Sequence, residues 1–390
     1  MERVKLGDVC KKTFNINWKK NIEKTFQYID LSSVSRKEFR IIDSSEINVN
    51  NAPSRAKQVV QSNDVIFATT RPTLKRITII TKEYDAQICS TGFTVLRVNS
   101  DMAYFRYIFY ILQSVKFIQS MEDMQHGASY PAVSDKDVKN YQIPLPALPK
   151  QKAIAQKLDL ARSLIELRKE SIAKLDDLAK SVFVEMFGDP LENEMGWEVV
   201  KLKNITNKIG SGSTPKGGKD SYKDEGLSLI RSLNIHDNTF KYKNLALIDD
   251  VQANKLSNVI VEKDDVLLNI TGASVCRCTI VPDNVLPARV NQHVAIIRTN
   301  ETIDAKFLLH LFISGGYKQK LMNIATSGGA TREAITKENL ELLSLINPPL
   351  PLQNKFAQTI QKIEAQKALY EAELIKLEEN FEGLLQASFT

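Results

Sequence analysis

Residues 151–186 read QKAIAQKLDLARSLIELRKESIAKLDDLAKSVFVEM, and residues 353–388 read QNKFAQTIQKIEAQKALYEAELIKLEENFEGLLQAS. In both stretches apolar residues recur at steps of four and three, which is the heptad pattern of a helix with one apolar seam. The two seams share their spacing, because each position of the first lies 202 residues before its counterpart in the second. The pattern predicts two matched helices of roughly 35 residues, each about 50 Å long.

Few polar residues interrupt these seams: Arg168 in the first, and Lys367 and Ser388 in the second. A stripe this long must be buried, and the other helix is its best partner, because the globular region between the two helices allows them to pair antiparallel. Two alternatives stay open: each helix packs on its own domain, or the seams mediate oligomerisation. The residues predicted to form the helix-pair interface are Ile154, Leu158, Ile165, Ile172, Leu175, Val182, Phe356, Ile360, Ile363, Leu374, Leu377, Phe381 and Leu384.

The rest of the chain is also repeated, at an offset close to 200 residues. The blocks that carry the repeat are VKL at 4–6 and 200–202, NDVI at 63–66 with DDVL at 264–267, and GAS at 127–129 with GAT at 329–331. A repeat of this length is a duplicated domain with its linker rather than a solenoid unit. We therefore predict two related globular halves, related by an approximate twofold axis across the helix pair, with one half at each end of a rod.

Each half combines strand and helix patterns. The predicted strands are 64–68, 77–81 and 93–98 in the first half and 266–270, 278–281 and 293–298 in the second, followed by helices at 104–117 and 307–323. Proline clusters end each half, and Pro149 and Pro351 suit the first turn of the helix that follows. The predicted fold class is therefore α+β, with globular domains at 1–146 and 189–348 and long helices at 147–188 and 349–390.

The composition favours a cytoplasmic protein with a polyanionic partner. The sequence has no apolar run long enough for a bilayer and no basic-then-apolar leader, and four cysteines in 390 residues make no disulfide framework. A net charge of +6 attracts phosphate groups, although a basic enzyme without a nucleic-acid partner has the same balance.

Two strings resemble catalytic motifs, and each lacks a required part. The sequence Asn347-Pro348-Pro349-Leu350 resembles the Asn-Pro-Pro-aromatic loop of adenine methyltransferases, but leucine cannot stack on a flipped base. The glycine-rich stretch 210–219 resembles a phosphate loop, but Ser213 and Asp220 stand where a glycine and a hydroxyl residue are required. We therefore expect neither methyl transfer nor nucleotide hydrolysis on this chain.

Cys276 and Cys278 are predicted to point to one face of a strand, with His293 nearby in sequence. Structural zinc sites take four ligands at characteristic spacings, and only these three are in reach. We interpret the two cysteines as core thiols and expect no metal.

The order of these pieces resembles the specificity subunits of type I restriction-modification systems over essentially the whole chain. The phrases that carry the resemblance are GSTP at 212–215, DVLLNITGAS at 265–274, RCTIV at 277–281, VNQHVAII at 290–297, DVIFA at 64–68, RP at 71–72 and CSTGF at 89–93. One departure is Cys276, because the family phrase usually has glycine at this place.

The resemblance implies a non-catalytic subunit whose two target-recognition domains each read one half of a bipartite site in double-stranded DNA. The helix pair would set the length of the spacer between the two halves. Two methyltransferase subunits would dock on the helices and domains and carry S-adenosylmethionine, and two restriction subunits would add ATP- and Mg²⁺-dependent cleavage in a larger assembly. This chain itself would bind no cofactor.

We expect DNA contacts in loops that follow strands, although each candidate can equally be a surface or fold-supporting residue. The candidates in the first domain are Arg55, Lys57, Arg71, Lys75, Arg76, Ser129 and Tyr130. Those in the second are Thr214, Lys216, Lys219, Arg231, Asn234, His236, Arg277, Asn291, Gln292, Thr331 and Arg332.

Two other classes of protein fit parts of this pattern. A self-contained DNA methyltransferase would carry recognition and chemistry in one chain and would bind S-adenosylmethionine without a partner. A structural tether would join two protein-binding domains, and its complex would show no salt-dependent affinity for DNA.

Overall fold

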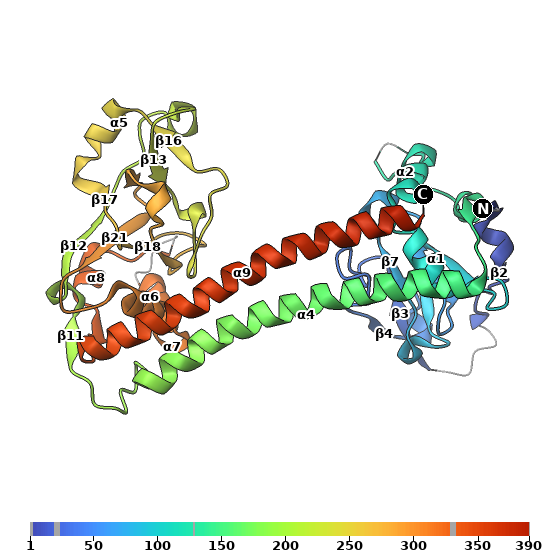
Figure 1. Ribbon diagram of the computed structural model, residues 1–390, viewed down its shortest axis with the longest axis horizontal. Helices are drawn as coiled ribbons and strands as arrows, with labels where there is room; N and C mark the ends of the chain where they lie inside the picture. The colour runs from blue at the N-terminus through green and yellow to red at the C-terminus, as the bar shows by residue number, and fades with distance from the viewer. Residues whose placement is uncertain (1–2, 19–23, 128, 328–332, 390) are drawn as a thin grey trace. The chain divides into compact units, whose positions relative to one another are not determined.

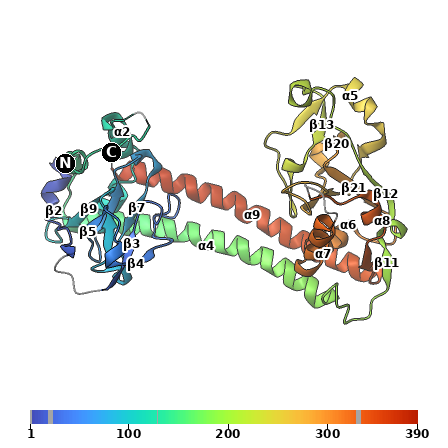
Figure 2. The same ribbon diagram turned by 180° about the vertical axis from the view of Figure 1, so that it is seen from behind.

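The computed structural model describes residues 3–18, 24–127, 129–327 and 333–389. Its contacts divide the chain into two compact units, unit 1 with Met1–Lys169 and Ala372–Thr390, and unit 2 with Glu170–Glu371. Each unit therefore holds one globular half and a part of each long helix (Figures 1 and 2). The unit boundaries lie inside the helices, whereas the sequence placed domain boundaries at the helix ends.

Unit 1 is built around three sheets. Its strands are β1 (Arg3–Lys5), β2 (Cys10–Lys11), β3 (Thr25–Ile29), β4 (Ser45–Asn48), β5 (Ala56–Val59), β6 (Val65–Ala68), β7 (Ile77–Ile79), β8 (Ile88–Ser90), β9 (Phe93–Val98) and β10 (Gln142–Pro144). The strand orders are β2-β9-β6-β7, β4-β3-β8-β5 and β1-β10, and β3 and β8 form the parallel pair of the second sheet.

Strand β6 is buried on both faces, as its uninterrupted apolar sequence predicts. Val65 and Phe67 face the core that includes the helices of unit 1, whereas Ile66 and Ala68 face a second cluster together with Val95. Successive side chains of a strand point to opposite faces, so this one short strand joins two separate cores.

Unit 2 repeats this arrangement. Its strands are β11 (Val199–Lys201), β12 (Thr206–Ser211), β13 (Leu227–Ile230), β14 (Ile235–His236), β15 (Thr239–Phe240), β16 (Ala246–Ile248), β17 (Ile260–Val261), β18 (Val266–Asn269), β19 (Cys278–Ile280), β20 (Ala288–Val290), β21 (Val294–Thr299) and β22 (Ser344–Ile346). The strand orders β12-β21-β18-β19, β16-β13-β20-β17 and β11-β22 match those of unit 1, and β13 and β20 are again parallel. The predicted duplication and the mixed fold class are confirmed.

The short helices differ from the prediction in one respect. The helices expected at 104–117 and 307–323 are each two helices, α1 (Phe105–Ile111) with α2 (Val115–Met124), and α6 (Ala305–Ile313) with α7 (Gly315–Thr326). The reason is a serine at each break: Ser114 and Ser314 have extended backbones, with ψ of 147° and 142°. The Ser114 hydroxyl accepts a hydrogen bond from the Phe117 amide, so it caps α2. The remaining short helices are α3 (Asp135–Asn140), α5 (Asp250–Lys255) and α8 (Lys337–Glu341).

The two long helices are α4 (Leu148–Phe187), with 40 residues, and α9 (Leu350–Ser388), with 39. Both begin within two residues of the predicted positions, with Pro149 and Pro351 in the first turn. Their length of about 60 Å follows from the rise per residue.

In unit 1 the helices pair antiparallel. Arg168 of α4 contacts Glu373 of α9 at 2.8 Å, and the Arg162 guanidinium lies 5.2 Å from the ring centre of Phe381. The residue number in α9 rises from 373 to 381 as the contacting residue number in α4 falls from 168 to 162, so the two helices run antiparallel. Arg168, the polar break in the first seam, is thus accommodated by an ion pair.

In unit 2 the same holds. Lys367 contacts Asp176 at 2.6 Å, and the ring centres of Phe356 and Phe183 are 5.6 Å apart. Lys367, the polar break in the second seam, is paired in the same way. Antiparallel pairing of α4 and α9 is therefore confirmed inside each unit.

The helices also pack on the globular halves, so the pairing does not exclude the first alternative. Buried residues one position away from the predicted seam carry this second contact: Phe183 and Phe187 lie against Phe307 of α6, and Ala155 joins the core of unit 1. Of the thirteen predicted seam residues, Leu158, Ile165, Phe356, Ile360 and Phe381 are buried and the other eight are half-buried. Within the described ranges, no helix is both long and apolar enough to cross a membrane.

Candidate nucleic-acid interface

The strands β6 and β7 are joined by a hairpin loop, residues 69–76, which we name loop 1. Its backbone is tied to two neighbouring segments: the Thr69 amide donates to the Gly92 carbonyl at 2.9 Å, and the Arg71 amide donates to the Pro131 carbonyl at 2.7 Å. The hydrogen bonds between β6 and β7 end at the loop with the bond from the Ala68 amide to the Arg76 carbonyl, at 2.9 Å. Loop 1 is therefore a fixed platform rather than a free connection.

The matching connection between β18 and β19, residues 270–277, is loop 2, and it repeats these bonds. The Ile270 amide donates to the His293 carbonyl at 3.0 Å, and the Gly272 amide donates to the Glu333 carbonyl at 3.0 Å. The Asn269 amide donates to the Arg277 carbonyl at 2.8 Å. The two loops thus share one backbone design at equivalent places of the two units.

Both loops contain two left-handed residues at matching positions. In loop 1 these are Arg71 and Lys75, with φ of 50° and 51°, and in loop 2 they are Gly272 and Cys276, with φ of 74° and 66°. Glycine adopts this region without strain, whereas side-chain-bearing residues rarely do. The glycine that the family resemblance led us to expect at Cys276 is explained by this backbone. The prediction that Cys276 lies on a strand face was wrong, because β19 begins only at Cys278.

In loop 1, Arg71 is the residue that projects into solvent beside an aromatic ring. Its guanidinium carbon lies 5.2 Å from the centre of the Tyr130 ring, and its Nη2 donates to the Ser129 carbonyl at a long 3.4 Å. Tyr130 is 72% exposed, which is high for a large aromatic side chain. The structure therefore brings three candidates together: Arg71, Ser129 and Tyr130.

The other basic candidates of unit 1 differ in their surroundings. The Nη1 of Arg76 donates to the carbonyls of Val34, at 2.7 Å, and Leu31, so this guanidinium holds the segment after β3. Burial lowers the pKa of Arg76. Arg55 and Lys57 are exposed at β5, and Lys75 is half-buried. Arg76 is better explained as part of the fold than as a DNA contact.

Beside loop 2 lies a chain of hydrogen-bonded polar side chains that ends on Thr271 of the loop. The Thr214 hydroxyl donates to Oε1 of Gln292, whose Nε2 lies 3.2 Å from Nε2 of His293. The other ring nitrogen of His293, Nδ1, lies 2.6 Å from the Thr271 hydroxyl. A neutral imidazole with its proton on Nδ1 satisfies both contacts. The sequence indicates His293 only as a candidate zinc ligand, and no pattern in it indicates the contact with Gln292.

The remaining candidates of unit 2 fall into three groups. Asn234 and Asn291 are buried, and the Asn234 amide donates to the Lys241 carbonyl at 2.8 Å, so both support the fold. Arg231 donates to the Asn244 carbonyl at 2.5 Å. Burial lowers the pKa of His236, with smaller effects from neighbouring cations. Lys216 and Lys219 are exposed and Arg277 is half-buried, whereas Thr331 and Arg332 lie outside the described residues.

The model of the family described as "Type I restriction modification DNA specificity domain" matches this chain twice, over residues 1–177 and 194–379. The chain belongs to this family. A curated relative, the type I restriction enzyme MjaVIII specificity subunit of Methanocaldococcus jannaschii, is 26% identical over 65% of this chain and 63% of its own length. The first curated relatives are thus matched over less than two thirds of their length.

Solved structures are similar over the whole of this specificity-family chain. A chain from a structure described as "Structural basis underlying complex assembly and conformational transition of the type I R-M system" is 27% identical with a TM-score of 0.67, covering 100% of this chain and 97% of that one. The type I restriction-modification S subunit from M. genitalium has a TM-score of 0.58 at 14% identity, covering 100% and 96%. The second likeness shows the fold alone.

The strings that resembled catalytic motifs have structural explanations in this family member. The Gln353 side chain donates to the Asn347 side chain at 3.2 Å and to the Pro348 carbonyl at 2.7 Å, so this proline junction anchors the start of α9. In the glycine-rich stretch, a Cβ at Gly212 would lie 1.8 Å from the Val290 carbonyl oxygen. Glycine is required there by a close backbone approach rather than by a bound phosphate.

The cysteines are protonated core groups at neutral pH. Burial raises the pKa of Cys276 to about 12, and it raises that of Cys278 well above the usual range. Within the described ranges, no three His, Cys, Asp or Glu side chains are grouped closely enough to hold a metal ion.

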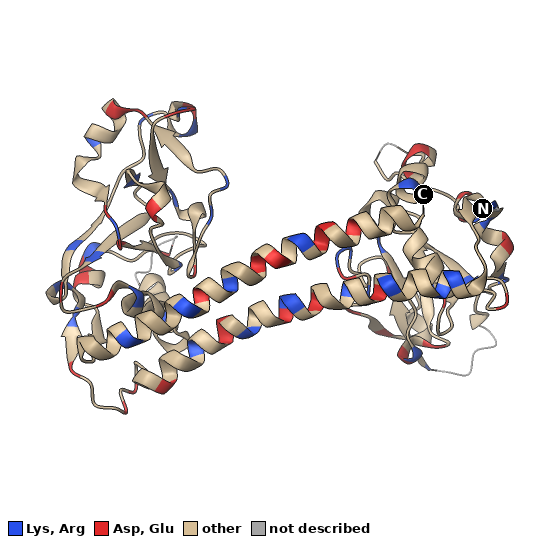
Figure 3. Cartoon of the chain, viewed as in Figure 1, with Lys and Arg blue, Asp and Glu red and all other residues tan. Residues whose placement is uncertain are grey.

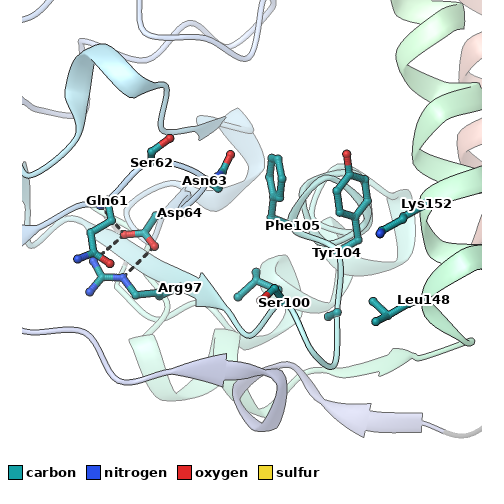
Figure 4. Close-up of a pocket in the computed structure, with 12 residues that line it drawn as sticks. Gln61, Ser62, Asn63, Asp64, Arg97, Ser100, Tyr104, Phe105, Leu148 and Lys152 are labelled. Atoms are coloured by element: carbon teal, nitrogen blue, oxygen red, sulfur yellow. Dashed lines mark hydrogen bonds and ion pairs between the residues drawn. The ribbon is translucent and has the colours of Figure 1, made fainter.

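Each unit of this specificity-family chain also has a cleft where the first turn of a long helix meets the globular half. The cleft of unit 1, about 410 Å³, has Asp64 and Arg97 at one end and Tyr104 and Lys152 at the other (Figure 4). Asp64 accepts hydrogen bonds from Arg97 at 2.8 and 3.0 Å and from the Gln61 amide at 2.8 Å. Both of its oxygens accept hydrogen bonds from neighbouring residues, so this carboxylate supports the fold.

Charge is distributed differently on the helices and on the loops. Along α4 and α9 positive and negative residues alternate (Figure 3), with short-range pairs such as Lys174–Glu170 at 2.7 Å and Lys180–Asp177 at 2.9 Å. These pairs neutralise the helix surface. Arg71 and Lys75 of loop 1 have no ion-pair partner among the described residues, so they are better placed to meet a polyanion.

Proposed function

We propose that this chain is the DNA-reading specificity subunit of a type I restriction-modification complex. Each unit reads one half of a bipartite double-stranded target, and the α4–α9 pair sets the spacer and docks two methyltransferase subunits. The observation that carries the proposal is the pair of equivalent loops, which share one backbone and differ in the side chains they present. Two loops with the same backbone and different side chains are suited to recognise two half-sites of different sequence.

The proposal leaves the chemistry to the partners. The methyltransferase subunits hold S-adenosylmethionine, and restriction subunits use ATP and Mg²⁺, so this chain is not an enzyme and carries no cofactor of its own. Its place is the cytoplasm, with the DNA. The engaged carboxylates and protonated thiols support this division of labour, because neither kind of group is poised as a base or nucleophile.

The helix lengths support the role in spacing. Helices of about 60 Å exceed one turn of duplex, which is roughly 34 Å, so readers joined by them can meet successive grooves on one face of the DNA. Side chains that reach base edges would specify sequence, and Lys and Arg on phosphates would fix register.

The decisive experiment is methylome sequencing of a host that expresses this chain with its methyltransferase partner. We expect methylation at one bipartite motif with an unspecified spacer. A continuous motif, or no methylation dependent on this chain, would contradict the proposal. Tight calorimetric binding of S-adenosylmethionine to the chain alone would instead support a self-contained methyltransferase, and affinity of the complex for DNA that is independent of salt would support a tether.

A second experiment tests the spacing role. Deleting residues 171–177 of α4 and the facing residues 366–372 of α9 removes one heptad from each helix and keeps both seams in register. The helices shorten by about 10 Å, so we expect a spacer shorter by about three base pairs with both half-sites unchanged. The control exchanges each heptad for an unrelated one of equal length, which should leave the spacer as it is. An unchanged spacer after the deletion would refute the spacing role.

A further inference from the structure

The two loops fill one backbone position in different ways. Arg71 of loop 1 and Gly272 of loop 2 both have positive φ. Their backbone amides also donate matching hydrogen bonds, to the carbonyl groups of Pro131 and Glu333. Loop 2 has Gly272 there, the residue that suits this backbone, whereas loop 1 has Arg71. Strained residues of this kind persist where the surroundings hold them and gather at functional sites. The arginine side chain is therefore the feature that needs an explanation.

The fold does not explain it. In the described chain Arg71 makes one long hydrogen bond, to the Ser129 carbonyl at 3.4 Å, although a guanidinium has five N–H donors. Arg76, five residues later, shows the contrast, because its Nη1 is held by two carbonyl groups of the segment after β3. Of the two arginines in loop 1, Arg76 supports the fold, whereas Arg71 is exposed and has donors that no hydrogen bond in the described chain uses.

Tyr130 holds the outward guanidinium in place. The two side chains meet at 5.2 Å between the guanidinium carbon and the ring centre, and both are exposed. Stacking on an aromatic face orients the plane of a guanidinium while leaving its edge free for hydrogen bonds. Tyr130 comes from the segment 126–132, whose backbone pairs with loop 1 through the bridge between Thr70 and Ala132, so the two partners are positioned together.

We propose that Arg71 reads a guanine in the major groove and that Tyr130 is its positioning residue. This inference rests on the proposed function, and it names the base that one residue of unit 1 recognises. A guanidinium edge donates two parallel hydrogen bonds to O6 and N7 of guanine, and no other base offers this pair of acceptors in the major groove. Lys75, a point charge on the same loop, suits a phosphate instead.

Loop 2 has no arginine at this position, so the guanine preference belongs to one half-site. Gly272 presents no side chain, and the groups beside loop 2 are the amide of Gln292 and the imidazole of His293. The bipartite target is therefore expected to contain a G·C pair, read by Arg71, in the half that unit 1 recognises.

The test measures methylation by the assembled complex on oligonucleotides that carry each base pair in turn across the target. Arg71→Lys keeps the charge but cannot make the paired contact. We expect discrimination at one G·C pair of one half-site to fall on the order of 10- to 100-fold, with the salt dependence of DNA binding retained. Tyr130→Leu should reduce the same discrimination to a lesser extent, and Tyr130→Phe, which keeps the ring, should preserve it.

Three outcomes are distinguishable. If Arg71→Ala weakens binding uniformly over all base pairs and lowers the salt slope by about one while Arg71→Lys behaves as wild type, Arg71 is a phosphate contact and the inference is overturned. Unchanged discrimination in both variants overturns it as well. Failure of the wild-type complex to methylate a bipartite site would instead remove the proposed function. Lys82→Ala, which removes one exposed charge of the same unit, is the matched control and should change no base preference.

Discussion

In unit 1 the buried Asp64 pairs with Arg97 and both hold the backbone, because Asp64 accepts from the Gln61 amide and Arg97 donates to the Val59 carbonyl. In unit 2 the buried Asp265 and Arg298 make the same contacts with the Glu262 amide and the Ile260 carbonyl. The start of each long helix is likewise held by one glutamine. Gln151 accepts from the Tyr104 amide and donates to the Pro146 carbonyl, and Gln353 does the same with Asp304 and Pro348. Where a side chain supports the backbone, the two units use the same chemistry.

The units differ where a long helix meets side chains of its domain. Arg162 of α4 is enclosed by the rings of Phe39, Phe109, Tyr110 and Phe381 at 4.8 to 5.3 Å. The equivalent position of α9 is Glu364, which accepts from Lys306 at 2.5 Å and from Asn238 at 3.2 Å. A cation enclosed by aromatic rings in unit 1 and an anion with polar partners in unit 2 thus attach the long helix to its domain at the same position. The comparison teaches that contacts to the backbone restrict the residue, whereas contacts between side chains can change in compensation.

The largest expected effect is on the stability of each unit when its buried aspartate, Asp64 or Asp265, is replaced. Asp64→Ala leaves the poorly exposed Arg97 without its carboxylate, so we expect unit 1 to lose about 3 kcal/mol or more of its free energy of unfolding. Asp265→Ala leaves Arg298 with the partly exposed Glu262 alone, so we expect a comparable but somewhat smaller loss in unit 2. Trp18 lies in unit 1 and Trp197 in unit 2, so Trp18→Phe and Trp197→Phe backgrounds let fluorescence follow one unit at a time during urea unfolding.

The control for this pair is Glu38→Ala. The carboxylate of Glu38 pairs with Arg40, but the two side chains are 46% and 72% exposed, so its loss should cost less than about 1 kcal/mol. Effects that differ strongly between Asp64→Ala and Asp265→Ala would break the idea of a common framework.

The next effect distinguishes the contact of Arg162 in unit 1 from that of Glu364 in unit 2 by their contributions to stability. Arg162→Ala removes a half-buried side chain from four rings and leaves Oε1 of the buried Gln113 without its donor, so we expect a loss of about 2 to 3 kcal/mol in unit 1. Glu364→Ala removes a partly exposed ion pair and should cost about 1 kcal/mol or less in unit 2. Arg162→Met, which keeps the aliphatic bulk, should recover part of the loss in urea unfolding. Equal losses for the two alanine variants would mean that the aromatic enclosure adds nothing.

The sequence was sufficient to predict features that depend on local periodicity and on internal repetition. The α4 and α9 seams, the strands such as β6, and the duplicated order of elements all belong to this class. Features set by contacts between distant segments were missed. The breaks at Ser114 and Ser314 interrupt patterns that remain apolar on both sides. Phe183 and Phe187 lie one position off the predicted seam because they contact Phe307 of α6 as well as Phe356 of α9.

The candidate site shows the same limit. Arg71 and Tyr130 were each chosen as candidates, but no pattern indicates that residues 59 positions apart in sequence stack on each other. Arg71 and Arg76 are indistinguishable as basic loop residues, and only the carbonyl groups of Leu31 and Val34 separate their roles. His293 was missed because its partner Thr271 comes from another strand connection.

A smaller effect follows from a third difference between the units. Tyr110 of unit 1 donates to Asp159, whereas its counterpart His310 of unit 2 is buried, with Nε2 lacking a hydrogen-bond partner in the described chain. Burial lowers the pKa of His310 from 6.5 to about 4, an effect that Lys306 strengthens and Glu364 opposes. Between these two pH values the unfolded chain binds the proton and the folded unit does not, so acidification destabilises unit 2. We expect His310 to account for a loss of about 2 kcal/mol between pH 7 and pH 5.

This loss is checked with His310→Phe, which keeps a ring against Phe356 and removes the titration. Urea unfolding of unit 2, followed by Trp197, should show a pH dependence that is smaller in the variant between pH 6.5 and 4. If wild type and variant lose the same stability over this range, the burial of a neutral imidazole is not the cause.

The smallest effect concerns the backbone of the two loops. Arg71→Gly gives loop 1 the residue that loop 2 has at this place and relieves a left-handed arginine, so unit 1 should gain up to about 1 kcal/mol while losing its guanine preference. The reciprocal variant is Gly272→Ala. A Cβ at Gly272 would meet no atom within 4 Å, so its expected loss of about 1 kcal/mol in unit 2 can come only from the backbone. Unfolding followed through Trp18 and Trp197 measures both changes. A gain in stability together with a loss of base discrimination is the signature of a strained residue retained for recognition, whereas a destabilised Arg71→Gly variant would mean that the arginine supports the fold.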